Sequence, residues 1–312
     1  MQNKFSIALH GGAGTLSRGQ MSPDKELAYK KDLQTALKMG AALLKQGRSA
    51  LDAVEASVRI LEDSPLFNAG KGSVFTHDGR HEMDACIMEG LNRNAGAVAG
   101  VQGVRNPVSL ARLVMEKSGH VLLCSEGAMK FAKKMEVALE PESYFYDELR
   151  YQQWQQAIRD GVVQLDHTPL EEKKFGTVGA VALDIYGNLA AATSTGGMTN
   201  KQFGRLGDSP IPGAGNYANN STCAVSCTGN GEFFIRGVVA YDVSCLIEYK
   251  GLSLEEACQE VIQNRLRAIG GEGGLIAVSP SGNLCLEFNT EGMYRAWQDT
   301  SGKEVVEIYK DY

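Results

Sequence analysis

The sequence predicts an α+β fold in which helices pack on mainly antiparallel sheets. Its strands are expected in hairpins: alternating apolar segments at 177–184 and 189–197 flank Gly187-Asn188, and segments at 274–279 and 284–288 flank a Pro-Ser-Gly-Asn turn. Its helices are expected in blocks between these hairpins. Because a doubly wound parallel sheet would alternate single strands with single helices, layers of helices over antiparallel sheets are favoured.

The N-terminal half is expected to open with a buried strand at 4–9 that ends in a glycine-rich turn at 10–14. Ser49 is a good N-cap, and Asn106-Pro107 places proline at the first position of another helix. Apolar residues at helical spacing predict the helices, and short apolar runs predict the strands. In order, we expect a helix at 24–45, a helix from 49 to 61, a loop at 62–73, strands near 82–88 and 95–101, and a helix from 107 to about 117.

The C-terminal half is expected to begin after an exposed, partly helical connector at about 136–176, which is charged and weakly patterned. After the first hairpin, the segments 223–228 and 232–237 are predicted to form an antiparallel pair. Helices near 237–249 and 253–268 follow, and the hairpin at 274–288 closes the predicted pattern.

Composition excludes several classes of function. The chain has 312 residues and a net charge of −6, and its sequence pI is about 5.5, so nucleic acid is not expected as the main partner. No run approaches 18 apolar residues, so no membrane partner is expected, and the first residues do not resemble a secretory signal. The seven cysteines are scattered without a C-x-x-C pair, which suits a reducing compartment. We therefore expect a cytoplasmic protein.

The junction Gly176-Thr177 suggests a chemistry of its own, because it lies where the polar connector meets a buried strand. If this peptide bond breaks, Thr177 acquires a free α-amine beside its own hydroxyl. An amine with an ordinary pKa near 8 can accept the hydroxyl proton without a histidine. Glycine before the bond leaves the carbonyl open to attack.

The chain resembles the plant-type asparaginase and isoaspartyl peptidase family of N-terminal nucleophile hydrolases over nearly its whole length. The segments that carry this resemblance run from LHGGAG (9–14) to FNTEGMYRAW (288–297). The most specific are SPLFNAGKGSVFT (64–76), GTVGAVALD (176–184), ATSTGGMTNK (192–201), GRLGDSP (204–210) and VSCTGNGE (225–232).

The resemblance implies a four-layer αββα sandwich, formed by one domain over 1–312. Self-cleavage before Thr177 would divide it into an α chain, 1–176, and a β chain, 177–312. Such enzymes assemble as a dimer of αβ heterodimers. The implied activity is hydrolysis of β-aspartyl (isoaspartyl) dipeptides and L-asparagine, with release of L-aspartate and with no cofactor in catalysis.

The resemblance also implies roles for particular residues beside the nucleophile. Thr195 would orient the Thr177 hydroxyl. Arg205 would hold the substrate α-carboxylate through two parallel hydrogen bonds, and Asp208 would accept from its α-ammonium. Thr228 and Gly229 match the oxyanion-hole segment, and Gly231 matches a further backbone position in contact with substrate.

A structural sodium ion is implied in the loop 61–72, held by main-chain carbonyl oxygens. Lys71 stands where relatives have an apolar residue, and Ser64 where some have cysteine. The matching positions are Leu61, Glu62, Ser64, Phe67, Ala69 and Lys71.

Two other functions remain as alternatives: a glycosylasparaginase-type amidase with the same threonine chemistry, and a catalytically silent scaffold of the same fold. Other sequence patterns give weaker support for a function. The HGGAG segment lacks a G-x-S-x-G partner, 213–218 follows no apolar strand, and 70–73 lacks the first glycine of a P-loop. His77 and His81 flank an Asp-Gly turn, which predicts a surface hairpin and not a metal site.

Overall fold

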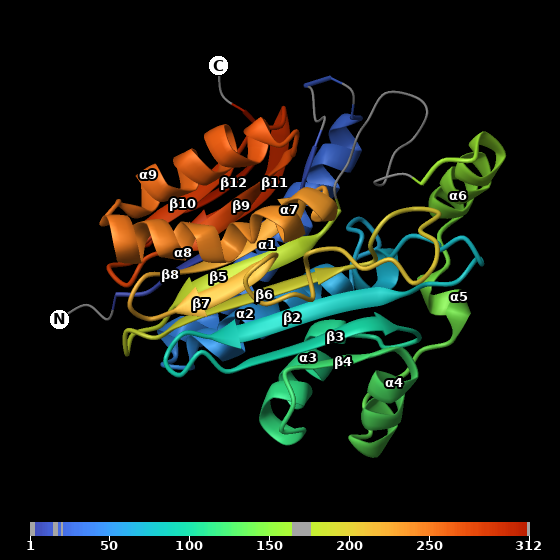
Figure 1. The fold of residues 1–312 in the computed structure, drawn as a ribbon, viewed down its shortest axis with the longest axis horizontal. Coiled ribbons are helices and arrows are strands. Elements are labelled where there is room, and N and C mark those ends of the chain that lie inside the picture. The colour runs from blue at the N-terminus through green and yellow to red at the C-terminus, as the bar shows by residue number, and fades with distance from the viewer. Residues whose placement is uncertain (1–3, 15–17, 20, 164–175, 311–312) are drawn as a thin grey trace.

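Two sheets form the centre of the molecule (Figure 1). The computed structural model describes residues 4–14, 18–19, 21–163 and 176–310. The larger sheet has eight strands in the order β12-β11-β1-β5-β6-β2-β3-β4, and the smaller has four in the order β10-β9-β8-β7. Every ladder pair is antiparallel except β3 with β4, in the part of the chain that is described. The predicted α+β class with mainly antiparallel sheets is confirmed.

The strands of the larger sheet are β1 (Ser6–Gly14), β2 (Met83–Glu89), β3 (Ala95–Val101), β4 (Leu122–Cys124), β5 (Val178–Leu183), β6 (Leu189–Thr195), β11 (Gly292–Gln298) and β12 (Glu304–Tyr309). Those of the smaller sheet are β7 (Asn216–Asn219), β8 (Cys223–Gly229), β9 (Gly273–Val278) and β10 (Leu284–Phe288). The α-helices are α1 (Pro23–Lys45), α2 (Ala50–Glu62), α3 (Pro107–Lys117), α4 (Ser125–Lys134), α5 (Glu142–Phe145), α6 (Glu148–Asp160), α7 (Gly231–Gly237), α8 (Val239–Lys250) and α9 (Leu254–Gln259), and a π-helical segment, Glu260–Leu266, continues α9. Among these helices none is long and apolar enough to cross a membrane.

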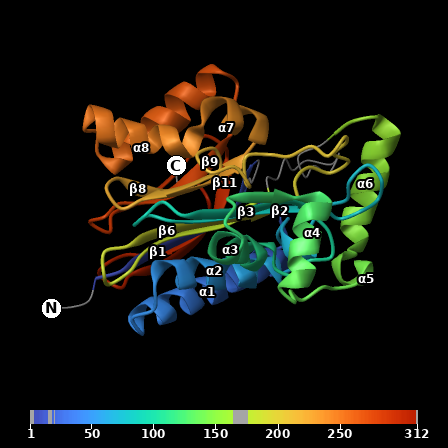
Figure 2. The same cartoon turned by 60° about the horizontal axis from the view of Figure 1, so that its bottom comes forward.

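The elements stack as helices, larger sheet, smaller sheet and helices (Figure 2). Alternation along β1 shows how the sequence builds these layers, because neighbouring side chains of a strand point to opposite faces. Ile7 and Leu9 enter the core beneath α1 and α2, whereas Ala8 enters the core shared with the smaller sheet and α8. This is the αββα arrangement expected from the resemblance.

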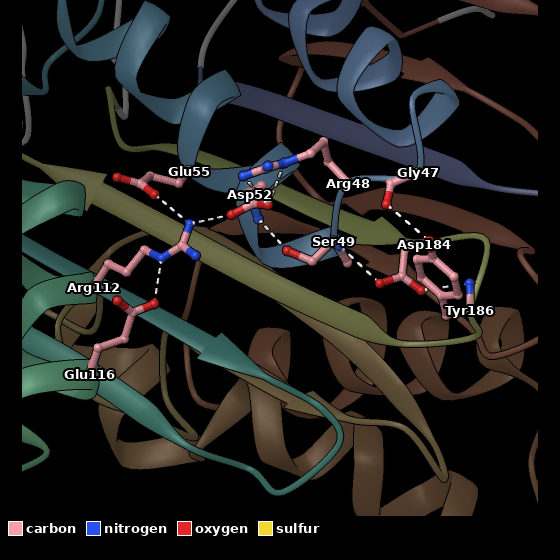
Figure 3. A network of polar contacts seen from close by, with 10 residues as sticks. Gly47, Arg48, Ser49, Asp52, Glu55, Arg112, Glu116, Asp184 and Tyr186 are labelled. Atoms are coloured by element: carbon pink, nitrogen blue, oxygen red, sulfur yellow. Dashed lines mark hydrogen bonds and ion pairs between the residues drawn. The ribbon is translucent and has the colours of Figure 1, made fainter.

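Segments from the two sides of the Gly176–Thr177 junction interleave in the larger sheet. Strand β1 lies between β11 and β5, and β6 lies between β5 and β2. A polar network fastens the same two halves together at the start of α2 (Figure 3). The Asp184 carboxylate, just after β5, accepts from the main-chain N–H of Ala50 at 3.1 Å. A break at the junction would therefore leave both halves in one common sheet.

The predicted helices and strands of the N-terminal half are confirmed with small changes, but the glycine-rich segment 10–14 was expected to be a turn. It continues β1 as far as Gly14. The segment is extended because β11 pairs with it on one side, with a bulge between His10 and Ala13 where Gly12 takes a φ of 113°. Glycine tolerates this conformation, so a turn-like composition is compatible with a central strand.

The predicted pairing of 223–228 with 232–237 is wrong. The first segment is β8, whose neighbours are β7 and β9, and the second forms α7. Both edges of β8 are thus occupied, and Phe234 of α7 is buried against the smaller sheet. Strands β11 and β12 were not predicted. They form a hairpin with each other, and β11 also pairs with β1, which lies far away in sequence.

The expected exposed connector at 136–176 is also partly wrong. Helices α5 and α6 pack on the body of the protein: Phe145 is buried, and Trp154 stacks on Phe75 with ring centroids 5.4 Å apart. Aromatic residues spaced along an otherwise polar segment supply this contact. Residues 164–175 of the connector lie outside the described part of the chain.

Candidate active site

Thr177 lies just before the first ladder residue of β5, where two hydroxyl groups meet. Its Oγ1 donates to Thr195 Oγ1 at 3.1 Å. Thr195 ends β6, the hairpin partner of β5, and its Oγ1 also accepts from the Gly197 N–H at 3.0 Å. Both threonines are almost fully buried. Thr195 therefore occupies the position from which it can orient the Thr177 hydroxyl.

The carbonyl oxygen of Thr177 is also held, by the imidazole of His10 on the neighbouring strand β1. His10 Nδ1 lies 3.0 Å from this oxygen, and Nε2 lies 2.9 Å from Ser226 Oγ of β8 in the opposite sheet. Burial lowers the pKa of His10 to about 3, so the ring is neutral at physiological pH. Side chain and main chain of Thr177 thus have separate anchors.

The two expected substrate anchors come together after β6. A Cβ added at Gly231 would lie 2.9 Å from Asp208 Oδ1 and 3.0 Å from Arg205 Nη2. Glycine at this position lets both charged groups approach the same stretch of backbone. Arg205 Nε and Nη2 each donate to one carboxylate oxygen of Glu232, both at 2.8 Å.

Asp208 is the most strongly perturbed of these charged groups. Burial raises the pKa of its carboxyl to about 7, and the positive charge of Arg205 opposes this rise only in part. Its Oδ2 has no hydrogen-bond partner among the described residues. A buried carboxylate oxygen without a partner is well suited to accept from an incoming ammonium group, which would also favour the charged form.

Arg205 also acts electrostatically on a buried carboxyl beside Thr195. Asp84 of β2 lies opposite Thr195 in the ladder, and burial raises the pKa of its carboxyl. The charges of Lys201 and Arg205 oppose that rise. The charge of Arg205 thus acts on Asp84, which lies opposite Thr195 in the ladder.

Thr228 and Gly229 lie at the end of β8. The Thr228 hydroxyl is buried and has no partner in the described part of the protein. A Cβ at Gly229 would lie 2.4 Å from the Phe234 ring and 2.5 Å from Glu272 O, so the close packing requires glycine. An unpartnered donor and a tightly packed backbone are what a preorganised oxyanion site needs.

In the candidate sodium loop, two glycines lie very close to main-chain carbonyl oxygens of the same loop. A Cβ at Gly70, which has a φ of +53°, would lie 2.4 Å from Glu62 O, and one at Gly72 would lie 2.1 Å from Phe67 O. The Lys71 ammonium lies 5.2 Å from the centroid of the Tyr144 ring. Its charge is therefore engaged by an aromatic face, and a lysine side chain is compatible with a main-chain ligand at this position.

The other residues expected to offer carbonyl oxygens to sodium lie in the same loop or at its start. Ser64 Oγ donates to Asp32 at 2.6 Å, so serine serves here as a structural hydrogen-bonding residue. The Glu62 carboxyl is buried, which raises its pKa to about 8, and its Oε1 accepts from Ser194 Oγ at 2.6 Å. Ser194 precedes Thr195, so this contact connects the loop directly to β6. The other matching positions, Leu61 and Ala69, are buried.

His77 and His81 each have a hydrogen-bonding neighbour in the protein. The expected surface hairpin is wrong for His81, which is buried and whose Nδ1 donates to Ser73 O at 2.9 Å. His77 Nδ1 lies 2.8 Å from Asn200 Oδ1. No cluster of three or more His, Cys, Asp or Glu residues suited to a metal was found where the chain is described.

Sequence reasoning missed three residues at the site: His10, Glu232 and Asn68. Glu232 lies in the segment 225–232, but nothing in the sequence predicted that it pairs with Arg205. Asn68 fastens the loop before β2 to the turn after β6: its Nδ2 donates to Gly197 O at 2.7 Å, and its main-chain oxygen accepts from Gly196 N at 2.9 Å. Only its position inside the segment 64–76 could have drawn attention to it.

Comparison with known proteins agrees with this geometry. A family model described as "Asparaginase" matches residues 3–308. The chain belongs to this asparaginase family. It is 55% identical over 311 residues to an isoaspartyl peptidase of Escherichia coli, covering 99% of this chain and 97% of that protein. It is also 42% identical over 293 residues to a plant-type L-asparaginase of Pyrobaculum calidifontis, covering 94% and 96%.

Other members of the asparaginase family extend the same match. An isoaspartyl peptidase of Salmonella typhimurium is 55% identical over 312 residues and is covered over its full length. The family match spans both sides of the Gly176–Thr177 junction. It therefore includes the nucleophile candidate, its orienting threonine and both charged anchors in a single alignment.

Proposed function

We propose that this protein is an autoprocessing threonine amidohydrolase that hydrolyses β-aspartyl dipeptides and L-asparagine and releases L-aspartate. The hydrogen bond from Thr177 Oγ1 to Thr195 Oγ1 carries this proposal. It places a buried, oriented hydroxyl at the junction where cleavage would create an N-terminus. The names of the isoaspartyl peptidases at 55% identity support the same activity.

Self-cleavage begins with attack of Thr177 Oγ1 on the carbonyl carbon of Gly176. The peptide C–N bond breaks, the hydroxyl proton passes to the departing nitrogen, and an ester joins Gly176 to the threonine oxygen. Water then hydrolyses the ester. The products are an α chain that ends at Gly176 and a β chain that begins with the free amine of Thr177.

In turnover, the new amine accepts the proton of the Thr177 hydroxyl as its oxygen attacks the β-carbonyl carbon of the substrate. The developing oxyanion accepts hydrogen bonds from the Thr228 hydroxyl and from main-chain N–H groups near Gly229. The amine returns the proton to the leaving group, which departs as ammonia or as the amine of a peptide. Water attacks the acyl-enzyme and releases L-aspartate.

Recognition of the free aspartyl end rests on Arg205 and Asp208. Glu232 uses two of the five guanidinium N–H groups, which leaves three donors for the substrate α-carboxylate without breaking the Glu232 pair. The unpartnered Oδ2 of Asp208 accepts from the α-ammonium. With both charges bound, the β-carbonyl is the group that reaches Thr177.

A sodium ion bound by the carbonyl oxygens of the loop 61–72 would fix the loop that carries Asn68. Such an ion would supply no chemistry to the reaction and would help only to place the turn after β6, to which Asn68 is hydrogen-bonded. We expect the processed enzyme to form a dimer of αβ heterodimers. We also expect it to act in the cytoplasm, where its seven unpaired thiols stay reduced.

Intact mass spectrometry of the purified protein tests the proposal, with Thr177→Ala as the control. Self-cleavage predicts pieces of about 19 kDa and about 15 kDa by length, with the smaller beginning at Thr177. The processed protein should hydrolyse β-aspartyl-leucine, and the variant should stay whole and inactive. A wild-type chain that stays whole and fails to hydrolyse the dipeptide would favour the silent scaffold.

A further inference from the structure

A single imidazole joins the nucleophile to the opposite sheet. His10 is completely buried on β1, between β5 and β8, and each of its ring nitrogens has one polar neighbour. Nδ1 lies 3.0 Å from Thr177 O, and Nε2 lies 2.9 Å from Ser226 Oγ. The space is matched to the ring: a Cβ at Gly179 would lie 2.4 Å from His10 Nε2 and 2.0 Å from Ser226 Oγ.

The partners of His10 determine its tautomer. A main-chain carbonyl oxygen can only accept, so Nδ1 must carry the proton and donate to Thr177 O. The neutral ring then has its lone pair at Nε2, and the Ser226 hydroxyl must donate to it. Burial disfavours the charged ring, which would otherwise place protons on both nitrogens.

The same reasoning sets the direction of the remaining hydrogen bonds. With its one proton given to His10, Ser226 Oγ accepts from Thr193 Oγ1 at 2.7 Å. Thr193 Oγ1 in turn accepts from Asn216 Nδ2 at 3.0 Å. The resulting chain runs in one direction, from Asn216 through Thr193, Ser226 and His10 to the carbonyl of Thr177. It begins beside Gly215, where an added Cβ would meet Asp208 Oδ2 at 2.7 Å.

Thr177 needs an anchor of this kind because it lies outside the sheet. The ladder of β5 with β6 begins at Val178, and its ladder with β1 ends at the pair Gly179–His10. Self-cleavage would remove the peptide bond that holds Thr177 from its N-terminal side. A terminal residue outside a ladder frays unless it is tied down.

We propose that His10 is a positioning residue that holds the main chain of the N-terminal threonine after self-cleavage, with Ser226 and Thr193 fixing the ring in the donating orientation. This inference rests on the proposed function. Thr195 fixes the hydroxyl of Thr177, and His10 fixes its carbonyl, so the reacting oxygen keeps its place relative to the bound substrate. Precise placement of this kind acts on the rate of the bound complex.

His10 is not the general base. One nitrogen donates to a carbonyl oxygen, and the other accepts from Ser226, so neither is directed at Thr177 Oγ1. Loss of His10 should therefore lower kcat without moving the pH at which kcat is half-maximal. A base would make that midpoint shift or vanish.

Two amide substitutions separate the contacts of the ring. In His10→Asn the side-chain amide lies near the position of Nδ1 and can still donate to Thr177 O, while Ser226 can donate to Ala192 O, 3.2 Å away. In His10→Gln the amide reaches the position of Nε2 and satisfies Ser226, but the Thr177 carbonyl loses its donor. His120→Gln, at an exposed histidine, is the matched control.

We expect His10→Gln to lower kcat for β-aspartyl-leucine about tenfold and His10→Asn to stay within about threefold of wild type, as the loss of one hydrogen bond predicts. KM and the pH midpoint should be unchanged in both, and His120→Gln should match wild type. Equal kcat in wild type and His10→Gln would overturn the inference, as would a lost pH midpoint or a tenfold rise in KM alone. A wild-type enzyme without hydrolysis would refute the proposed function instead.

Ser226→Ala gives a second test that leaves the histidine in place and covers the case in which the His10 variants do not fold. Without the serine hydroxyl, His10 Nε2 loses its hydrogen-bond donor, and the ring is held only through its contact with Thr177 O. We expect kcat to fall about threefold with KM unchanged. Unchanged kcat in a folded Ser226→Ala protein would show that the chain of hydrogen bonds does not position Thr177.

Discussion

The hydroxyl of Thr195 can be removed without changing the shape of its side chain. Thr195→Val replaces it with a methyl group of similar size. Two contacts disappear: the bond accepted from Thr177 Oγ1 at 3.1 Å and the bond accepted from Gly197 N at 3.0 Å. The rest of β6 keeps its ladder contacts with β5 and β2.

The magnitude follows from the two donors left behind. A buried donor that loses its acceptor costs about 1–3 kcal/mol. For Thr177 this cost appears in orientation of the nucleophile, so kcat should fall about tenfold to a hundredfold, at about 1.4 kcal/mol per factor of ten. For Gly197 it appears in folding, so the free energy of unfolding should fall by about 1–2 kcal/mol.

Thr199→Val is a matched control four residues away. Thr199 is as deeply buried as Thr195, but its hydroxyl has no partner within the described structure. Removing an unpaired buried hydroxyl should leave stability unchanged or slightly raise it. Both variants should be assayed for the rate of self-cleavage, for kcat on β-aspartyl-leucine and for unfolding in urea. Equal rates in the two variants would refute the role assigned to Thr195.

Three further predictions concern the anchors and the interleaved sheet. Burial raises the pKa of Asp208 to about 7, so its carboxyl becomes neutral as the pH falls below that value. Below this pH the inhibition constant of L-aspartate should rise about tenfold per pH unit. An inhibition constant that stays the same between about pH 5.5 and 8 would contradict the role of Asp208. Arg205→Ala should raise KM for β-aspartyl dipeptides about tenfold or more, since a charge-assisted contact of about 1.5–3 kcal/mol is lost; unchanged kcat/KM would exclude Arg205 as the carboxylate anchor. Asp184→Ala removes the acceptor for Ala50 N and for two N–H groups of its own turn. The free energy of unfolding in urea should therefore fall by about 2–3 kcal/mol. A fall below about 0.5 kcal/mol would show that this contact does not stabilise the association of the two halves.

Much of the fold was predictable because the relevant signals are local. Ser49 caps α2 as expected, with its Oγ accepting from Asp52 N at 3.1 Å, and Pro107 opens α3. The β5–β6 and β9–β10 hairpins follow from alternating apolar residues and glycine-containing turns. Strands β11 and β12 were missed. Strand β12 is a half-exposed edge strand with little apolar alternation, and β11 is joined to the sheet by β1, a distant segment whose pairing leaves no pattern in β11 alone.

For the candidate site, the motifs predicted which residues take part but not all of their contacts. The candidate nucleophile Thr177, Thr195 beside it and the candidate anchors were proposed in advance, because each lies in a segment that resembles the family. Glu232 also lies in such a segment, but its contact with Arg205 was not predicted, since it depends on how α7 packs against the preceding loop. The role of His10 depends on three strands that meet only in the folded protein.

The sequence by itself determined most of the helices, the β5–β6 and β9–β10 hairpins, the family and the chemical identity of the candidate site residues. Only the tertiary structure decided that β1, from before the Gly176–Thr177 junction, lies between β5 and β11, from after it, and that Asp208 and His10 lie in surroundings that shift their pKa values. The physical reason is that capping, periodicity and turns act between residues close in the chain. Burial, charge and strand order instead depend on neighbours that folding brings together from distant positions.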